Sequence, residues 1–104
     1  MTSQGTARGR FGRAIRDRHL RRAEMAAREL GHLSLDDALA LCELIADFDP
    51  PRYERAALRW LQRFVEERSP PLAEVGLAVS ALGELQQGTR AIGVETLRGL
   101  LRRV

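Results

Sequence analysis

The stretch DPPRYERAALRWLQRFVEERSPP, residues 49–71, lies between two Pro-Pro pairs and holds the only tryptophan and the only tyrosine of the chain. Asp49 is a residue type that caps helices, and Pro50 has the fixed φ that suits a first helical turn. Ser69 precedes a proline, which disfavours the helical conformation at that position. The sequence therefore predicts one helix between Asp49 and Ser69.

The apolar residues of this helix fall on two adjoining faces. At 100° per residue, the members of the first face lie within about 60° of one another. They are Tyr53, Ala57, Trp60 and Phe64. Leu58, Leu61 and Val65 form a second stripe beside them. A helix that is apolar on two sides is expected to contact neighbours on both, so we place it at the centre of the fold.

The opposite side of the same helix carries Arg52, Arg55, Arg59 and Arg63. Arginines near a helix start run against the preference of the helix dipole, so helix stability alone does not explain them. Two interpretations stay open. The favoured one is a solvated face with modest pairing of Arg63 to Glu67, or else a salt-bridge partner for a polar strip on the preceding helix. That strip is formed by Asp36, Glu43 and Asp47. The other is a contact with nucleic acid or an acidic partner.

Composition indicates one small domain. The chain has 104 residues, of which 44% are hydrophobic and 30% charged, enough for one core. All seventeen basic residues are arginine, which is typical of a GC-rich genome. The single cysteine, Cys42, excludes an internal disulfide, and no segment approaches the ~18 apolar residues of a membrane span. We expect a cytoplasmic protein without membrane contact.

The basic charge is concentrated at the N-terminus. Residues 1–33 hold eight arginines and three acids. Residues 1–12 are rich in Gly, Ser, Thr and Arg and predict a flexible basic tail, which leaves residues 13–104 as the single domain. The RGRFGR segment of this tail is similar to nucleic-acid-binding tails, although a merely solvated tail is favoured. The candidate contacts for nucleic acid or an acidic partner are Arg8, Arg10, Arg13, Arg16, Arg18, Arg21, Arg22, Arg52, Arg55, Arg59 and Arg63.

Periodicity predicts four further helices around the central one. Gly31 ends the first, Ser34 begins the second, and Gly88 with Thr89 separates the last two. The predicted ranges are Arg13–Leu30, Leu35–Phe48, Leu72–Gln87 and Arg90–Arg103. The fold class is therefore all-α with about five helices.

One of these helices carries a line of small residues on one side. They are Ala73, Gly76, Ser80 and Gly83. Such a face lets another backbone approach closely. Tight packing inside the monomer is the favoured interpretation, and a groove or a dimer contact is the alternative. These residues are our candidate protein contacts.

A faint internal repeat relates the second half of the chain to the middle. An offset of 37 residues superposes Leu35 on Leu72 and Trp60 on Leu97, and it preserves residue class more than identity. The pattern resembles the helical hairpin repeats of HEAT and armadillo proteins over residues 34–104. This resemblance implies two antiparallel hairpins stacked in a HEAT-like manner, with the N-terminal helix covering the other end.

Two further resemblances rest on short motifs. AARELG and LSLDDALAL in Ala26–Leu41, followed by YERAALRW in Tyr53–Trp60, resemble an uncharacterised family of small all-helical proteins from high-GC bacteria, which implies a fold and a compartment but no site residues. LGELQQGTRAIGVETLRGLL, residues 82–101, resembles the helix-turn-helix of MerR-type regulators. That likeness implies that Gly93 lies in the turn and that Thr96 and Arg98 face a DNA groove.

No pattern in the chain is typical of catalysis. His19 and His32 are not paired in the pattern, and Cys42 lies on an apolar face where a thiol usually packs as a small hydrophobic group. We predict no catalytic residue, no metal, no cofactor and no small-molecule substrate. The function ranked first is a protein-interaction or assembly module without enzymatic activity, with a protein partner or a homo-oligomer. The alternative is a nucleic-acid-binding accessory protein that uses the basic N-terminal segment.

Overall fold

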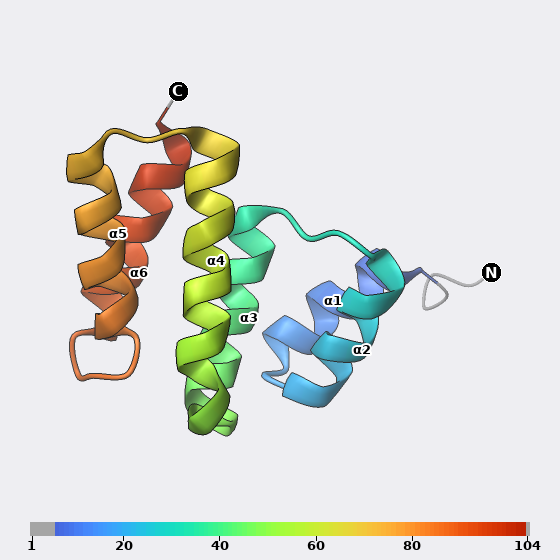
Figure 1. Cartoon of the computed structure of the whole chain (residues 1–104). Coiled ribbons are helices and arrows are strands. Elements are labelled where there is room, and N and C mark those ends of the chain that lie inside the picture. The colour runs from blue at the N-terminus through green and yellow to red at the C-terminus, as the bar shows by residue number, and fades with distance from the viewer. Residues whose placement is uncertain (1–5, 104) are drawn as a thin grey trace.

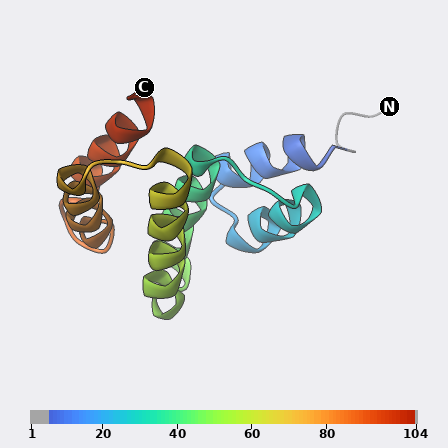
Figure 2. The same ribbon diagram turned by 45° about the horizontal axis from the view of Figure 1, so that its top comes forward.

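The computed structural model describes residues 6–103, and this part of the chain forms six α-helices and one 3-10 turn, with no strand. Consecutive helices pack in pairs, and the three pairs lie side by side (Figures 1 and 2). The described part of the molecule is elongated, with extents of 47 × 29 × 20 Å. The pairs are α1 Ala7–Arg16 with α2 Leu20–Leu30, α3 Leu35–Phe48 with α4 Tyr53–Arg68, and α5 Leu72–Glu84 with α6 Arg90–Arg102. The predicted all-helical class is confirmed, with six helices in place of five.

The first helix begins earlier than the sequence predicts. The side-chain oxygen of Thr6 accepts the backbone N–H of Gly9 at 3.0 Å and caps α1, so the helix starts at Ala7. Phe11 is only 1% exposed and packs with α2 and with Leu44 of α3. Residues 7–12 are therefore helical and contribute to the core, which corrects the expected flexible tail over residues 1–12. Residues 1–5 of that tail lie outside the described residues.

The predicted helix from Arg13 to Leu30 is two helices. Arg18 has a φ of 55°, a left-handed conformation that interrupts the chain between α1 and α2. His19 then caps α2, because its Nδ1 accepts the backbone N–H of Arg22 at 3.2 Å. No glycine or proline marks this break, so the helical pattern appears continuous in the sequence.

Helix α4 begins differently from the prediction. The 3-10 turn η2, Pro50–Arg52, precedes it, and Asp49 makes no capping bond to α4. The carboxylate of Asp49 instead accepts the Arg52 guanidinium at 2.6 Å. The helix ends before Ser69, as expected, but Ser69 is left-handed, with a φ of 45°.

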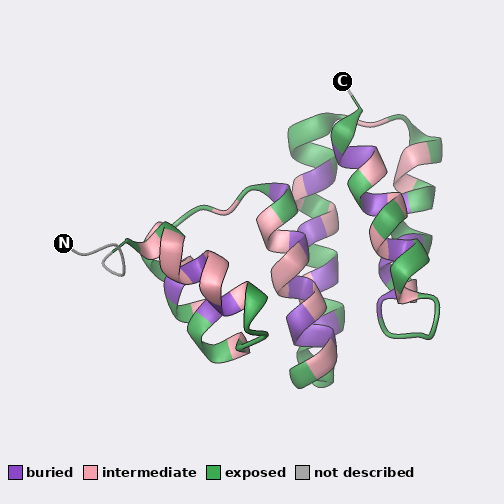
Figure 3. Cartoon of the chain, turned by 180° about the vertical axis from the view of Figure 1, so that it is seen from behind, coloured by how far each residue is buried: buried purple, intermediate pink, exposed green. Residues whose placement is uncertain are grey.

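The first apolar face of α4 is the centre of the larger core cluster, which joins α3, α4, α5 and α6 (Figure 3). All four residues predicted for that face, Tyr53, Ala57, Trp60 and Phe64, are buried. The second stripe is only partly covered: Leu61 is half-buried and packs against this core, whereas Leu58 is 58% exposed and Val65 is also exposed. Helix α4 contacts α3 on one side and α5 on the other, as expected of a central helix, but Leu58 and Val65 of the second stripe stay exposed.

The offset of the internal repeat is present in the helix starts. Helix α5 begins at Leu72, 37 residues after α3 begins at Leu35. Helix α6 begins at Arg90, 37 residues after α4 begins at Tyr53. Residues related by this offset of 37 are not buried to the same extent. Leu35 is 3% exposed, whereas its counterpart Leu72 is 87% exposed. The helix α5 therefore leaves open a face whose counterpart in α3 is covered.

Helices α5 and α6 approach closely at Gly93. A Cβ on Gly93 would lie 2.6 Å from the carbonyl oxygen of Ala81, so only glycine fits there. Gly93 lies inside α6, which begins at Arg90. The MerR-like interpretation requires Gly93 in the turn and is wrong on this point. Thr96, which it assigned to a DNA groove, donates its hydroxyl to a backbone carbonyl of its own helix at 2.9 Å.

Candidate interaction surfaces

Helices α4 and α5 together present a broad exposed apolar surface. On α4 it consists of the second stripe, and on α5 it continues across the outer side of the helix. We call this surface the apolar face and define it by Leu58, Leu61, Val65, Leu72, Leu77 and Val79 with the small residues Ala73, Gly76, Ser80 and Gly83. Large exposed apolar patches on small proteins usually mark interaction sites.

The small residues of α5 lie in the middle of the apolar face. All four of the predicted contacts, Ala73, Gly76, Ser80 and Gly83, are exposed. A Cβ added at Gly76 or Gly83 would meet no atom within 4 Å. The favoured interpretation, tight packing of these residues inside the monomer, is therefore wrong. Their role in a contact with another chain stays a prediction.

A shallow groove of about 190 Å³ runs between α4 and α5 at the edge of the apolar face. Leu58 and Leu61 line it from α4, and Val79 and Gly83 line it from α5. Beneath them the Tyr53 hydroxyl donates to the carbonyl oxygen of Leu82 at 2.6 Å, and burial raises the pKa of Tyr53. This buried bond fixes α4 against α5, so the groove has a rigid floor.

The arginine side of α4 faces a second hollow. A cleft of about 570 Å³ lies between α2, α3 and α4. Its apolar lining includes Ala38, Leu41 and Ile45 of α3 and Trp60 of α4. Arg52 of η2 and three arginines of α4, Arg55, Arg59 and Arg63, also line it. The spacing of these arginines was evident from the sequence, but the cleft was not.

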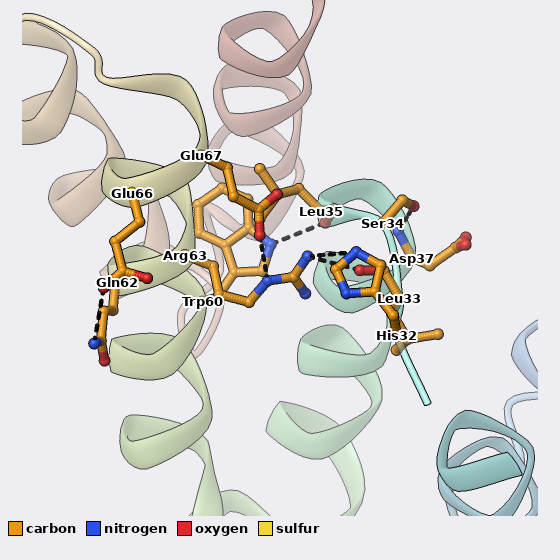
Figure 4. Close-up of polar contacts among 10 residues, drawn as sticks. All are labelled: His32, Leu33, Ser34, Leu35, Asp37, Trp60, Gln62, Arg63, Glu66 and Glu67. Carbon is orange, nitrogen blue, oxygen red and sulfur yellow. Dashed lines mark hydrogen bonds and ion pairs between the residues drawn. The ribbon is translucent and has the colours of Figure 1, made fainter. Parts of the chain in front are cut away.

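The two outer arginines bridge the ends of this cleft. The guanidinium of Arg52 donates to both carboxylate oxygens of Glu24 on α2, at 2.8 and 3.1 Å. These hydrogen bonds, with a further one to Asp49, raise the pKa of Arg52. At the other end, Arg63 donates to the carbonyl oxygen of Leu33 at 2.7 Å (Figure 4).

Arg63 is also held by its own helix. Its Nε donates to the carboxylate of Glu67 at 2.8 Å, and this hydrogen bond lowers the pKa of Glu67. The imidazole of His32 lies 3.5 Å from the same guanidinium. Figure 4 shows Arg63 extending from α4 toward the segment that precedes α3. Both ends of the cleft are therefore closed by fixed arginines.

The two inner arginines have no such partners. Arg55 and Arg59 are exposed and line the cleft, and within residues 6–103 neither forms an ion pair or a hydrogen bond through its side chain. Their charges face solvent over a partly apolar hollow. A ligand with negative charge and apolar side chains is the chemistry that this arrangement fits.

Two residues of the polar strip of α3, Asp47 and Glu43, pair with arginines that lie outside α4. Asp47 accepts Arg18 from the α1–α2 connection and Arg90 from α6. Burial raises the pKa of Asp47, but the hydrogen bonds from Arg90 and Arg18 outweigh it, so the pKa lies below its ordinary value. Glu43 lies 3.5 Å from Arg98 of α6. The expected pairing of this strip with the arginine face of α4 is therefore wrong.

The N-terminal arginines divide into two groups. Arg8 pairs with Asp37, Arg10 with Glu29 and Arg18 with Asp47. The remaining predicted contacts lie on α1 and α2 without a carboxylate partner among residues 6–103. They are Arg13, Arg16, Arg21 and Arg22. The structure thus uses part of the predicted basic surface to join its own helices.

The one cysteine of the chain is buried. The Cys42 thiol is buried near the carbonyl oxygen of Ala56, at 3.9 Å, and burial raises its pKa to about 12. Between residues 6 and 103, no three His, Cys, Asp or Glu side chains are grouped so that they could hold a metal ion. In the same range, no helix combines the length and the apolar character of a membrane span.

No protein-family model, curated protein or solved structure matches this chain. The resemblances to a family from high-GC bacteria and to HEAT and armadillo repeats therefore stay expectations. The function is inferred below from the surfaces of the chain itself.

Proposed function

We propose that this chain is a small helical protein-interaction module that assembles with a second copy of itself through the apolar face and has no enzymatic activity. The observation that carries the proposal is the exposure of large apolar side chains beside small ones. Leu58 and Val79 are 58% and 51% exposed, and they flank the open space over Gly83. Removing such side chains from water stabilises a complex by about 25 cal/mol per Å² of apolar area.

A second copy is the occupant that best fits this face. The apolar face carries both projecting leucines, such as Leu58 and Leu72, and open notches over Gly76 and Gly83. A two-fold symmetric contact requires one surface to supply both the projections and the notches that receive them, and the apolar face has both. The groove at the edge of the face is lined by one charged residue, Glu54, beside apolar and small residues.

A HEAT-like stacking of the hairpins belongs to the same proposal. The equal offset of the helix starts supports it, since α5 and α6 follow α3 and α4 by 37 residues each. In a stack of hairpins, an uncovered apolar face at one end is where the next hairpin packs. A second copy would then continue the stack from α5. We also propose a cytoplasmic location, because the single cysteine suits a reducing compartment.

The test is sedimentation velocity on the wild type and on single glutamate variants. Leu58→Glu and Val79→Glu each place a charge in the apolar face, which we expect to weaken self-association by about tenfold or more. Ile92→Glu is the matched control, because Ile92 is equally exposed, at 60%, but lies on α6 outside the face. A wild type that stays monomeric at high concentration would overturn the proposal, as would equal effects of all three variants.

Nucleic-acid binding is the second candidate function. Arg13, Arg16, Arg21 and Arg22 favour it, since they carry no carboxylate partner among the described residues. Phosphate contacts predict an affinity that falls steeply with salt. The test is the binding of mixed single-stranded DNA and RNA at low and high salt by the wild type and by a variant with these four arginines changed to glutamine. No detectable binding at low salt removes this candidate.

A further inference from the structure

The cleft between α2, α3 and α4 is a second surface, separate from the apolar face. No residue of the apolar face lines it. Its base contains aliphatic side chains of α3, with Leu41 and Ile45 among them. Glu24 and Arg52 bridge it at one end, and Arg63 bridges it at the other. These bridges hold α2 and the start of α3 against α4, so the cleft is formed before any ligand enters.

The charges at the cleft are unbalanced. Arg52 and Arg63 are neutralised by carboxylates of the chain, whereas Arg55 and Arg59 are not. Arg55 and Arg59 are four residues apart on one helix, so their guanidinium groups are neighbours along α4. Two adjacent free guanidinium groups beside an apolar hollow recognise two carboxylates carried by an apolar chain.

We propose that this cleft binds an acidic amphipathic segment of a partner protein. Two carboxylates of the segment, spaced about one helical turn apart, pair with Arg55 and Arg59, and the apolar side chains between them enter the hollow above Leu41 and Ile45. Glu43 and Asp47 of α3 are already paired with Arg98, Arg18 and Arg90, so these two carboxylates are not the ones that pair with Arg55 and Arg59. We assign the acidic segment to a different protein.

The lining favours a peptide over nucleic acid. Single-stranded bases bind by stacking on exposed aromatic rings. The one aromatic ring in the cleft, Trp60, is 2% exposed, stacks on Phe64 and donates its indole N–H to Leu35. Its ring is therefore not free to stack on a base. Leucine-like side chains need only the apolar surface that is present.

The experiment selects ligands from a displayed library of random peptides long enough for a few helical turns, with the full chain as bait. We expect the selected peptides to carry paired acidic residues beside leucine-like residues. Their binding is then measured by the fluorescence of Trp60, the only tryptophan, which lies in the cleft wall. The affinity is expected to fall as salt is added, because the guanidinium groups are exposed.

Two double variants decide where the peptides bind. Arg55→Glu with Arg59→Glu should weaken binding by about tenfold or more, since hydrogen bonds to charged groups are lost. As the matched control, Arg16→Glu with Arg102→Glu makes the same charge change at exposed arginines that do not line the cleft. This control should change the affinity by less than about twofold. The neutral pair Arg55→Gln with Arg59→Gln should give a smaller loss in the same direction.

Three results would overturn the proposal. One is a selection that yields no peptides or peptides without acidic residues. Another is equal binding by the wild type and the Arg55 and Arg59 variants. The third is single-stranded DNA binding that is tighter than peptide binding and is lost in the same variants, which would make the cleft a nucleic-acid site. The self-association test does not affect these outcomes, because Leu58→Glu and Val79→Glu leave the cleft lining unchanged.

Discussion

The indole N–H of Trp60 donates a hydrogen bond of 2.9 Å to the backbone carbonyl of Leu35, the first residue of α3. The same ring stacks on Phe64, with the ring centroids 5.5 Å apart. Trp60 thus joins the middle of α4 to the start of α3 and fixes how the two helices align. Trp60 belongs to the larger core and also lines the cleft between α2, α3 and α4, so one side chain supports both the fold and a candidate site.

Replacement of Trp60 should therefore destabilise the whole chain. We expect Trp60→Ala to lower the free energy of unfolding by ~3 to 5 kcal/mol, since it leaves a large cavity. Trp60→Phe keeps most of the volume and removes the hydrogen bond, which should cost about 1 to 2 kcal/mol. Urea unfolding followed by circular dichroism measures both. The exposed control Ile92→Ala should have a small effect, and a loss under about 1 kcal/mol in Trp60→Ala would show that Trp60 is not central.

Two glycines of α6 should respond oppositely to alanine. Gly93→Ala places a Cβ 2.6 Å from the carbonyl oxygen of Ala81, so α5 and α6 must separate, and we expect a loss of about 1 to 3 kcal/mol. At Gly99 the nearest atom would be a guanidinium nitrogen of Arg102 at 3.9 Å, an ordinary contact. Gly99→Ala should therefore stabilise the helix by up to about 1 kcal/mol. Thermal unfolding of both variants checks this, and equal signs would show that the close approach at Gly93 is absent.

Much of the fold could be predicted from the sequence because its helix boundaries have local causes. Ser34 caps α3 by accepting the amide of Asp37, and Gly31 ends α2 with a positive φ, so both limits were found. The break at Arg18 could not be predicted, because the left-handed residue there is an arginine and no glycine or proline marks the position. A local signal for α1 did exist, in Thr6 as a cap and in the apolar spacing that begins at Phe11.

The ion pairs of Asp47 should make stability depend on pH in the acid range. Its pKa is lower in the folded chain than in the unfolded chain. Its contribution is therefore present above the unfolded pKa of about 3.9 and is lost as the pH falls through the lower folded value. Asp47→Asn should lower stability at neutral pH by about 1 kcal/mol and reduce the loss of stability below about pH 4.

Urea unfolding at a series of pH values measures both effects. Asp17→Asn is the control, because Asp17 is exposed and forms no ion pair within residues 6–103. An Asp47→Asn variant whose acid profile matches that of the wild type would mean that the bonds from Arg18 and Arg90 contribute nothing in solution.

The Cys42 thiol should react slowly while the chain is folded. With a pKa of about 12, roughly one thiol in ten thousand is ionised at pH 8, and the sulfur is buried as well. We expect slow reaction with a thiol reagent in the native chain and fast reaction in urea. Rapid modification of the native chain at pH 8 would mean that the α3–α4 interface opens readily, because Cys42 lies between these helices.

The candidate sites were only partly predictable, since a sequence pattern places residues on a face but does not show what covers that face. The spacing of Arg55 and Arg59 was visible, but the binding of Arg52 to Glu24 depends on where α2 packs. Likewise, Leu58 has the pattern of a core residue but is 58% exposed, since the neighbouring helix α5 does not cover it. Tertiary packing decided both cases.

The central claim is that a second copy covers the apolar face, and hydroxyl-radical footprinting at low and high protein concentration tests it most directly. Side-chain oxidation at Leu58, Leu72 and Leu77 should fall as the concentration rises. Oxidation at Phe48 and Ile92, which are also exposed but lie outside the face, should not change. Oxidation at the three leucines that is independent of concentration, or protection that is equal at all five residues, would contradict the claim.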